Sequence, residues 1–330
     1  MSLTRRQILG LLGLLVITLT AGGLRLLVYR DLEGVLTWSW PAPEIARLRW
    51  TAVAVAAIAG ISLAVSGVLL QALLRNPLAS PFILGISSGA ALGVMTALYV
   101  AYVTKRSWVL AGSDTPPALL GAMLTLAVVY LLGQRRGWLD PLSLVLIGVV
   151  VSAICGALIM FLQHLVPQGL RGDLVTWMMG HIRQSVGAPF LLTAGGLALV
   201  GTIVALLMGR AMDAATLGDD EARSIGLAIG PLRLALFFLA GVLTSVAVAL
   251  AGPIGFVGLI APHAARLVLG PRHAALVVGA ALVGVTLLVG GDVVSQSIAV
   301  SGGRMPVGVF TALIGGPAFI WLLRSGKGQV

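Results

Sequence analysis

Histidine and methionine side chains are the first candidates for chemistry in this sequence. His164, His181 and the pair Met178-Met179 border one stretch between two apolar runs. Imidazole and thioether groups bind soft metals and haem iron, but residues of this kind beside apolar runs more often pack at a membrane interface. His263 and His273 stand ten residues apart without a His-Glu-x-x-His pattern. We therefore predict no metal site in this chain.

Signatures of ATP hydrolysis and of catalysis inside the membrane are absent from the sequence. It has no Gly-x-x-x-x-Gly-Lys-Ser/Thr segment, so it cannot hold ATP and Mg²⁺ by the P-loop route. No paired aspartates, Ser/His arrangement or metal-ligand cluster falls within the apolar runs. We predict no catalytic residue and no cofactor in the chain.

Acidic residues gather in the longest polar segment, at about 210–233, which holds four of the eleven acids. Within it, residues 217–226 predict a short helix with acids near its positive N-terminal end and Gly226 at its stop. Leu217, Ala222 and Ile225 would give this helix a small apolar face. Such a helix suits docking into a groove of another protein. An ordinary solvated loop fits the residues equally well.

Two segments cannot continue a regular membrane helix. Residues 71–81 form a polar, proline-bearing link, and residues 252–263 carry three glycines and two prolines. Irregular backbone at membrane depth is tolerated only against protein or a water-filled cavity. The second segment therefore points to a transport path, with a kinked packing helix as the alternative.

The amino-acid composition indicates what kind of elements surround these two segments. Hydrophobic residues make up 58% of the 330 residues and charged residues 10%, against about 25% in soluble domains. The basic residues behind the net charge of +10 are scattered between apolar runs, as beside membrane spans, so no nucleic-acid partner is expected. The lone Cys155 excludes an internal disulfide. The chain is predicted to be an all-α, polytopic membrane protein.

About ten transmembrane helices are predicted, in one domain over residues 1–330. The expected spans are 7–28, 50–70, 82–102, 118–132, 142–162, 190–208, 234–250, 254–269, 274–291 and 307–323. Asp140 before Pro141 predicts a capped start of the fifth span. Gly85, Gly89 and Gly93 repeat on one face of the third, where they either line a pore or let a neighbouring helix approach closely.

An even number of spans places both termini on one side of the membrane. With the N-terminus inside, twelve Lys and Arg residues fall on the cytoplasmic side and nine outside, which weakly favours cytoplasmic termini. Residues 4–9 resemble a twin-arginine export signal. The apolar stretch after them reaches about residue 28 without a clear cleavage site, so we predict an uncleaved first span.

Ordered motifs from about Arg47 to Leu323 carry a resemblance to a known family. They include Arg75-Asn76-Pro77-Leu78-Ala79-x-Pro81, Leu84-Gly85-Ile86-Ser87-Ser88-Gly89-Ala90, Trp177-Met178-Met179-Gly180, Gly255-Phe256-Val257-Gly258-Leu259-Ile260-x-Pro262-His263-x-x-Arg266 and Pro306-Val307-Gly308-Val309. In this set and its order, the chain resembles the FecCD-type permeases, the type II ABC importer subunits for ferric siderophores, haem and cobalamin.

The resemblance implies a ten-helix permease fold, a second permease copy, ATPase subunits that bind ATP and Mg²⁺, and a periplasmic or lipid-anchored binding protein. It implies that the segment at about 210–233 is a cytoplasmic coupling loop, and that two regions close the cytoplasmic end of the pathway. The predicted coupling residues are Leu217, Gly218, Ala222, Ile225 and Gly226. The predicted gate residues are Asn76, Pro77, Leu78, Pro141 and Ser143, and Gly85, Gly89 and Gly93 are expected to line the pathway.

The sequence departs from the family pattern near the outer face. Arg304 stands where the family usually has an acid, and the usual Arg-x-Pro-Arg reads Arg47-Leu48-Arg49-Trp50. Gln296 takes the place of an arginine that commonly follows the aspartate of the ninth span. We predict that Arg47, Arg49 and Arg304 dock the binding protein. Their alternative role is to anchor span ends at lipid headgroups.

The predicted function is therefore alternating-access import of an iron chelate across the bacterial inner membrane, with a ferric siderophore ahead of haem or cobalamin. A stand-alone secondary transporter is the alternative, and an intramembrane enzyme a third class. Ion coupling in a secondary transporter would require carboxylates inside the membrane. Nearly all eleven acids lie in loops or at span ends, which argues against that alternative.

Overall fold

Helices account for most of the structure. The computed structural model describes residues 4–30, 35–105, 114–135, 138–300 and 303–324. These residues contain thirteen α-helices, one short 3₁₀ helix and three two-stranded antiparallel ribbons. The all-α prediction is confirmed.

Eight of the described helices are long and apolar enough to cross a membrane. They are α1 (Arg5–Leu27), α2 (Pro43–Leu74), α3 (Ile86–Thr104), α4 (Thr115–Leu132), α5 (Pro141–Leu165), α7 (Ala188–Leu207), α10 (Ile229–Ala251) and α12 (His273–Ser297). Two further helices, α11 (Val257–Leu269) and α13 (Val307–Arg324), occupy the eighth and tenth predicted spans. Each predicted span thus has a helix, although α2, with 32 residues, extends beyond its predicted span at both ends.

Several short elements were not predicted from the sequence. They are the 3₁₀ helix η1 (Pro81–Leu84), the helices α6 (Gln168–Met178) and α8 (Gly209–Ala215), and the ribbons β1–β2 (Val28–Arg30 with Leu36–Trp38), β3–β4 (Gln134–Arg135 with Trp138–Leu139) and β5–β6 (Ala299–Val300 with Gly303–Arg304). The third predicted span is divided, because Gly85 has a left-handed backbone (φ +73°) between η1 and α3. The predicted helix at 217–226 is present as α9 (Asp219–Ser224).

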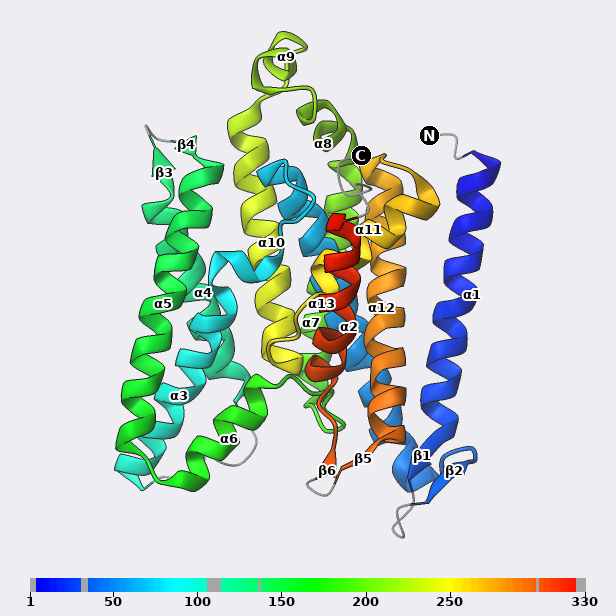
Figure 1. The fold of residues 1–330 in the computed structure, drawn as a ribbon, viewed down its shortest axis with the longest axis vertical. Helices are drawn as coiled ribbons and strands as arrows, with labels where there is room; N and C mark the ends of the chain where they lie inside the picture. Colours follow the sequence, from blue (N-terminus) through cyan, green and yellow to red (C-terminus); the bar gives the residue numbers. More distant parts are fainter. Residues whose placement is uncertain (1–3, 31–34, 106–113, 136–137, 301–302, 325–330) are drawn as a thin grey trace.

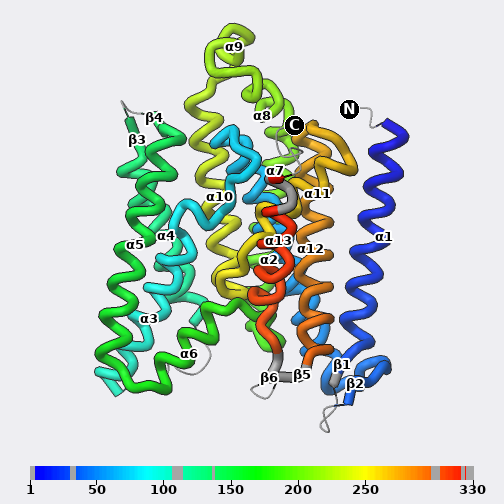
Figure 2. The backbone as a smooth tube through the Cα atoms, in the orientation of Figure 1, coloured from blue at the N-terminus to red at the C-terminus, as the bar shows by residue number. Residues whose placement is uncertain are grey.

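The centre of the bundle is formed by α2, α10 and α12, with α1 on one side and α3–α5 on the other (Figures 1 and 2). Close approach holds this centre together. A Cβ added to Gly60 of α2 would lie 2.5 Å from the carbonyl oxygen of Gly284 in α12. Side-chain hydrogen bonds add to the packing, since the Ser66 and Thr244 hydroxyl oxygens are 2.7 Å apart between α2 and α10. Both devices suit a lipid environment, where the hydrophobic effect does not drive helices together.

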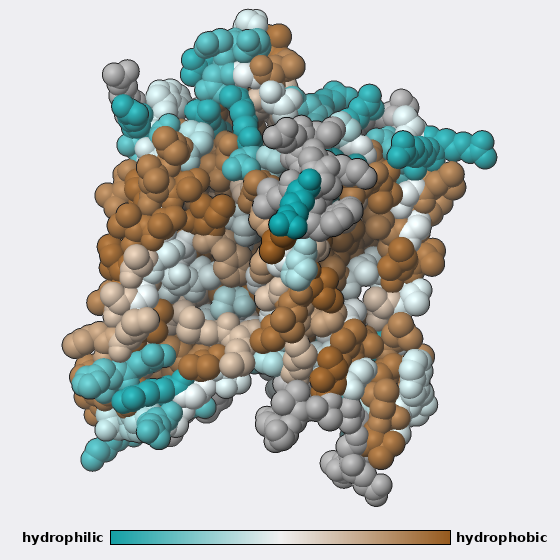
Figure 3. All heavy atoms as spheres, viewed as in Figure 1, coloured by the Kyte–Doolittle hydropathy of each residue, from teal (hydrophilic) through white to brown (hydrophobic). Residues whose placement is uncertain are grey.

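The bundle has polar regions at the two ends of its long axis, with an apolar band between them (Figure 3). One end carries the start of α1, the α2–η1 link, ribbon β3–β4, helices α8 and α9 and the end of α13 (Figure 1). The other carries α6 and ribbons β1–β2 and β5–β6. We name these the α9 end and the α6 end. The start of α1 and the end of α13 lie together, as an even number of spans requires.

The break between α10 and α11 falls where the sequence predicts it. Gly252 has φ +71°, and Phe256, a rare non-glycine residue with a left-handed backbone, has φ +67°. Neighbouring segments supply hydrogen bonds to the backbone groups of this irregular region. The His181 backbone N–H donates to the Ala251 carbonyl at 2.9 Å. The Gly308 N–H at the start of α13 donates in turn to the Gly180 carbonyl at 3.2 Å. The irregular backbone is therefore packed in protein, as membrane depth demands.

Candidate functional site

Helix α9 is held between two glycines whose backbones are rare for L-residues. Gly218, at its N-cap, has φ +126°, and Gly226, just beyond its C-terminus, has φ +85°. The Leu227 N–H donates to the Ala222 carbonyl at 3.0 Å, and the Gly226 N–H to the Arg223 carbonyl at 2.9 Å. These bonds satisfy carbonyls that a helix end leaves free. The two glycines therefore give α9 defined ends.

The apolar side chains in and beside α9 divide between a solvent-exposed face and a buried face. Leu217 and Ile225 are each 62% exposed at the α9 end, whereas Ala222 is 0% exposed. An exposed Leu and Ile pair on a short helix has the character of a protein contact. Ala222 instead packs inward and does not share the exposed face with Leu217 and Ile225, so its part in coupling stays a prediction. Its small side chain is what the helix needs to lie close to the rest of the chain.

Asp219 joins α9 to two other parts of the molecule. Its carboxylate accepts from the Arg75 guanidinium, with Nη2 to Oδ1 at 2.5 Å. It also accepts from Arg233 in the first turns of α10, with Nη2 to Oδ2 at 2.9 Å and to Oδ1 at 3.1 Å. One carboxylate shared by two guanidinium groups makes charge-assisted hydrogen bonds to both. The predicted coupling helix and the predicted gate link are therefore in direct contact.

The gate link itself is a tight turn. Arg75 ends α2 in a left-handed conformation (φ 47°). The Asn76 side-chain oxygen accepts from the Leu78 N–H at 2.9 Å, and its backbone carbonyl accepts from the Ala79 N–H at 3.0 Å. Asparagine is suited to such self-closing turns. The sequence Asn76-Pro77-Leu78 thus fixes the chain as it leaves α2 and enters η1.

The start of α5, the other predicted gate region, also lies at the α9 end. The Asp140 carboxylate accepts from the Ser143 hydroxyl at 2.6 Å and from the Ser143 N–H at 2.9 Å, which confirms the predicted N-cap before Pro141. These two bonds hold the pKa of Asp140 below its ordinary value, and the bond from the Ser143 hydroxyl has the larger effect. Further along α5, a Cβ on Gly85 would lie 2.9 Å from the Gly148 carbonyl oxygen. Segment η1–α3 therefore rests directly on α5.

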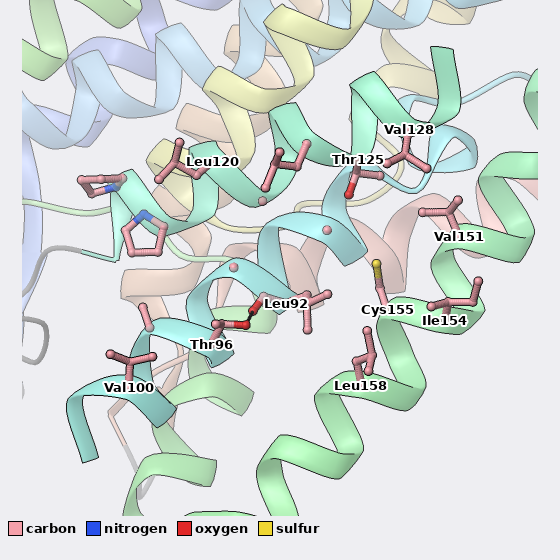
Figure 4. Close-up of a pocket in the computed structure, with 17 residues that line it drawn as sticks. Leu92, Thr96, Val100, Leu120, Thr125, Val128, Val151, Ile154, Cys155 and Leu158 are labelled. Atoms are coloured by element: carbon pink, nitrogen blue, oxygen red, sulfur yellow. Dashed lines mark hydrogen bonds between the residues drawn. The ribbon is translucent and has the colours of Figure 1, made fainter. Parts of the chain in front are cut away.

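Gly89 and Gly93 of α3 serve close packing, as Gly85 does just before the helix. A Cβ on Gly89 would overlap the Thr125 side chain, and one on Gly93 would lie 2.2 Å from the Pro117 carbonyl oxygen, both in α4. Gly89 and Gly93 also border a cavity of about 750 Å³ between α3, α4 and α5 (Figure 4). Its lining is almost entirely apolar. Pathway lining by these glycines stays a prediction, whereas their packing role is visible in the structure.

Arg47, Arg49 and Arg304 were predicted to form one docking set, and the structure sets Arg49 apart from the exposed Arg47. Arg49 is 4% exposed, its guanidinium carbon lies 4.0 Å from the centre of the Tyr29 ring, and it donates to the Leu26 carbonyl. Its availability for docking is therefore corrected: it holds the β1–β2 ribbon against α1 and α2. Arg47 is exposed. The backbone of Arg304 belongs to β6, and its side chain lies outside the described residues.

A buried ion pair lies between α1 and α12. Arg25 Nε donates to Asp292 Oδ2, with side chains 1% and 8% exposed. The Gln296 side-chain amide adds a hydrogen bond to the same carboxylate oxygen at 3.3 Å. A lone charge at this depth would be costly. Arg25 supplies Asp292 with the basic partner that such a buried carboxylate needs.

These partnerships are what sequence reasoning missed. Asp213 accepts from the His273 N–H at 2.9 Å and lies 2.7 Å from its ring Nδ1, which ties α8 to the start of α12. The signal for Asp213 and Asp219 was present, as acids concentrated in one loop. Nothing in the spacing identified His273, which is 60 residues from Asp213, or Arg75, which is 144 residues from Asp219. Among the described residues, no three His, Cys, Asp or Glu side chains gather closely enough to hold a metal ion.

A bundle of membrane-length helices around a broken helix pair, with a short amphipathic helix at one end, defines a polytopic transport permease. The chain belongs to the FecCD transport family, whose model matches residues 10–325. It is 35% identical to the hemin transport system permease protein HmuU of Yersinia pestis, over 98% of this chain and 97% of that protein. It is 38% identical to the cobalamin import system permease protein BtuC of Halobacterium salinarum, over 85% and 73%.

Two further likenesses concern iron permeases and the fold. The iron(3+)-hydroxamate import system permease protein FhuB of Salmonella typhimurium is 36% identical over 90% of this chain, which spans 42% of that longer protein. A solved metal-chelate type ABC transporter in an inward-facing conformation superposes with a TM-score of 0.83 at 30% identity, over 96% of this chain and 99% of that one. The ABC importer permease fold is confirmed, and the secondary-transporter alternative is set aside.

Proposed function

We propose that this chain is the membrane subunit of an ATP-driven importer that moves an iron chelate, in the first place a ferric siderophore, by alternating access. The observation that carries the proposal is the likeness to ABC importer permeases along nearly the whole chain. The chain would supply contacts that differ between two conformations, and separate ATPase subunits would bind ATP and Mg²⁺.

Haem is the second candidate ligand. The match to the permease named for hemin transport covers 97% of that relative, whereas the match to the hydroxamate permease covers 42% of that protein. The cobalamin permease is the third kind of relative. All three ligands are bulky chelates of a metal, so one permease architecture serves them.

At the α9 end we place the ATPase subunits. The exposed pair Leu217 and Ile225 would contact an ATPase, with Gly218 and Gly226 fixing the orientation of α9. Asp219 would pass a displacement of α9 to Arg75 and so to the Asn76-Pro77-Leu78 link. Together with the start of α5 at Pro141 and Ser143, this link would close the pathway toward the cytoplasm.

The α6 end would then face the periplasm, with both termini in the cytoplasm and the chain in the bacterial inner membrane. A periplasmic or lipid-anchored binding protein would deliver the ligand there, in part through Arg47 and Arg304. A second copy of this chain would complete the pathway. The twelve-to-nine distribution of basic residues supports this orientation.

The proposed function predicts ATP-dependent uptake by reconstituted vesicles. The chain, with the ATPase and binding protein encoded beside it, should take up a labelled ferric siderophore at least tenfold faster with ATP than with ADP. Uptake rates of hemin and cobalamin, measured with the same components, would show which chelate is preferred. Uptake that is equally fast without ATP, or a permease that never co-purifies with an ATPase, would refute the proposal.

Docking of the binding protein tests the two arginines that remain in the set. The double variant Arg47→Glu/Arg304→Glu should weaken docking at least tenfold at low salt, chiefly through slower association, because charges at the rim of an interface act mainly on the encounter rate. Surface plasmon resonance on permease in nanodiscs measures both rates. The matched variant Arg49→Glu should instead lower thermal stability, since Arg49 is buried. Unchanged docking in the double variant would leave lipid anchoring as the role of Arg47 and Arg304.

A further inference from the structure

A basic cavity lies between the beginning of α1 and the end of α11, at the α9 end. It has a volume of about 380 Å³, and its lining includes Arg6, Gln7, His263 and Arg266. Gln7 closes it on the α1 side, since its side-chain Nε2 donates to the Leu269 carbonyl at 2.9 Å and its Oε1 accepts from the Thr4 N–H at 3.1 Å. The cavity is thus built by a fixed junction of two helices.

Among the residues that the structure describes, neither Arg6 nor Arg266 of this cavity forms an ion pair. Segments 4–10 and 263–273 contain four arginines and no acidic residue. At the same end of the bundle, Asp213 is paired with His273, and Asp219 with Arg75 and Arg233. In the part of the chain that the structure describes, half-buried Arg266 forms no ion pair, and its one side-chain hydrogen bond is a 3.4 Å contact with Gln71. A buried cation without an anion is unfavourable.

His263 adds an unfilled hydrogen-bonding position. Its ring Nε2 is buried and has no hydrogen-bond partner among the described residues. Phosphate and guanidinium groups form bidentate charge-assisted bonds, and an imidazole N–H donates to a phosphate oxygen as well. Two arginines and a histidine around one cavity therefore match a phosphate-bearing anion.

The flanks of the cavity identify the source of that anion. Ile8, Leu9 and Leu12 on α1 and Leu267 on α11 are all exposed apolar side chains. They continue from the cavity along the membrane-facing surface of the two helices. A phosphate group with acyl chains satisfies both features, whereas free phosphate uses only the first. Basic pockets between membrane helices are known receptors for anionic lipid headgroups.

We propose that this cavity binds the phosphate headgroup of an anionic phospholipid, held by Arg6, Arg266 and His263, with its acyl chains along α1 and α11. The bound lipid neutralises Arg266 and joins α1 to α11 beyond the Gln7 contact. Because α11 follows the broken backbone at Gly252–Phe256, the lipid contributes to holding the outer wall of that region. This site lies apart from α9 and does not depend on the nature of the transported ligand.

The test measures lipid binding directly. Purified full-length permease is titrated with phosphatidylglycerol or phosphatidylcholine of identical acyl chains, and bound lipid is counted by native mass spectrometry alongside thermal unfolding. Arg6→Gln and Arg266→Gln should each weaken phosphatidylglycerol binding about fivefold, as expected for one basic residue at an anionic surface. Arg5→Gln and Arg272→Gln, which remove the same charge outside the cavity, should leave it unchanged.

Three results would overturn the proposal: equal binding of the two lipids by the unaltered chain, equal losses in the control variants, or displacement by glycerol phosphate at the same concentration as phosphatidylglycerol. The last would assign the cavity to a free anion. If Arg266→Gln fails to fold, exposed Arg6→Gln decides alone. Transport is not part of the readout, so failure of the proposed function leaves this test intact.

Discussion

Replacing Asp292 with alanine should lower the free energy of unfolding by about 3–5 kcal/mol, the cost of leaving one member of a buried ion pair without its partner. Arg25 would remain 1% exposed between α1 and α12 with its main counter-charge removed. The Gln296 amide, now bonded to the same carboxylate, could not replace that charge. Thermal unfolding in mild detergent would show the loss as a large drop in Tm.

The double variant Arg25→Met/Asp292→Leu provides the companion measurement. Apolar residues of similar volume often replace a buried pair without loss, because neither charge then needs to be desolvated. The double variant should therefore be more stable than Asp292→Ala. Asp220→Ala is the matched control, since Asp220 and Arg223 form an exposed pair at 3.7 Å that contributes little. An Asp292→Ala chain as stable as Asp220→Ala would contradict the structural role of the buried pair.

Uncoupling at α9 is the second large effect we expect. Leu217→Asp/Ile225→Asp places two charges on the exposed apolar pair, and burying unpaired charge in an interface is strongly unfavourable. ATPase activity stimulated by the binding protein should fall at least tenfold, and ATP-dependent uptake with it. The variant should still insert and unfold at the original Tm, because both side chains are exposed.

Two variants on the same helix sharpen this experiment. Asp220→Ala removes an exposed charge from α9 without altering its apolar pair, and it should leave stimulated ATPase activity intact. Ala222→Arg should behave differently from both, because Ala222 is fully buried and a large cation there disrupts α9 itself. Normal stimulation in Leu217→Asp/Ile225→Asp would exclude this pair from the ATPase contact.

The sequence predicted the features that depend on local composition. Apolar runs located a helix for each of the ten predicted spans, eight of them of membrane-spanning length. Asp140-Pro141 predicted the start of α5, and the glycines and prolines of 252–263 predicted the break before α11. These features follow from length, side-chain polarity and backbone restriction, which a linear sequence carries. The candidate coupling helix was predicted for the same reason, although α9 is shorter than expected.

Tertiary contacts could not be predicted in this way. Arg49 lies at the end of a predicted span, where a surface role was reasonable, but the unpredicted β1–β2 ribbon covers it and Tyr29 lies under its guanidinium. Ala222 shares helical spacing with Leu217 and Ile225, yet the turn at Gly218 directs it inward. In each case a short, non-periodic segment decides the environment, and such segments leave no hydrophobic pattern.

The two guanidinium contacts of Asp219 have a thermodynamic consequence. The Arg75 contact joins α9 to the end of α2, and the Arg233 contact joins it to the start of α10. A protein that binds α9 and prefers one position of it therefore also biases the turn at Asn76. Coupling free energies are reciprocal. Any factor by which a docked subunit stabilises one conformation of that turn must equal the factor by which the same conformation raises the affinity for the subunit. If the turn at Asn76 moves as the transported ligand passes it, the affinity of the permease for a docked ATPase subunit would change by the same factor.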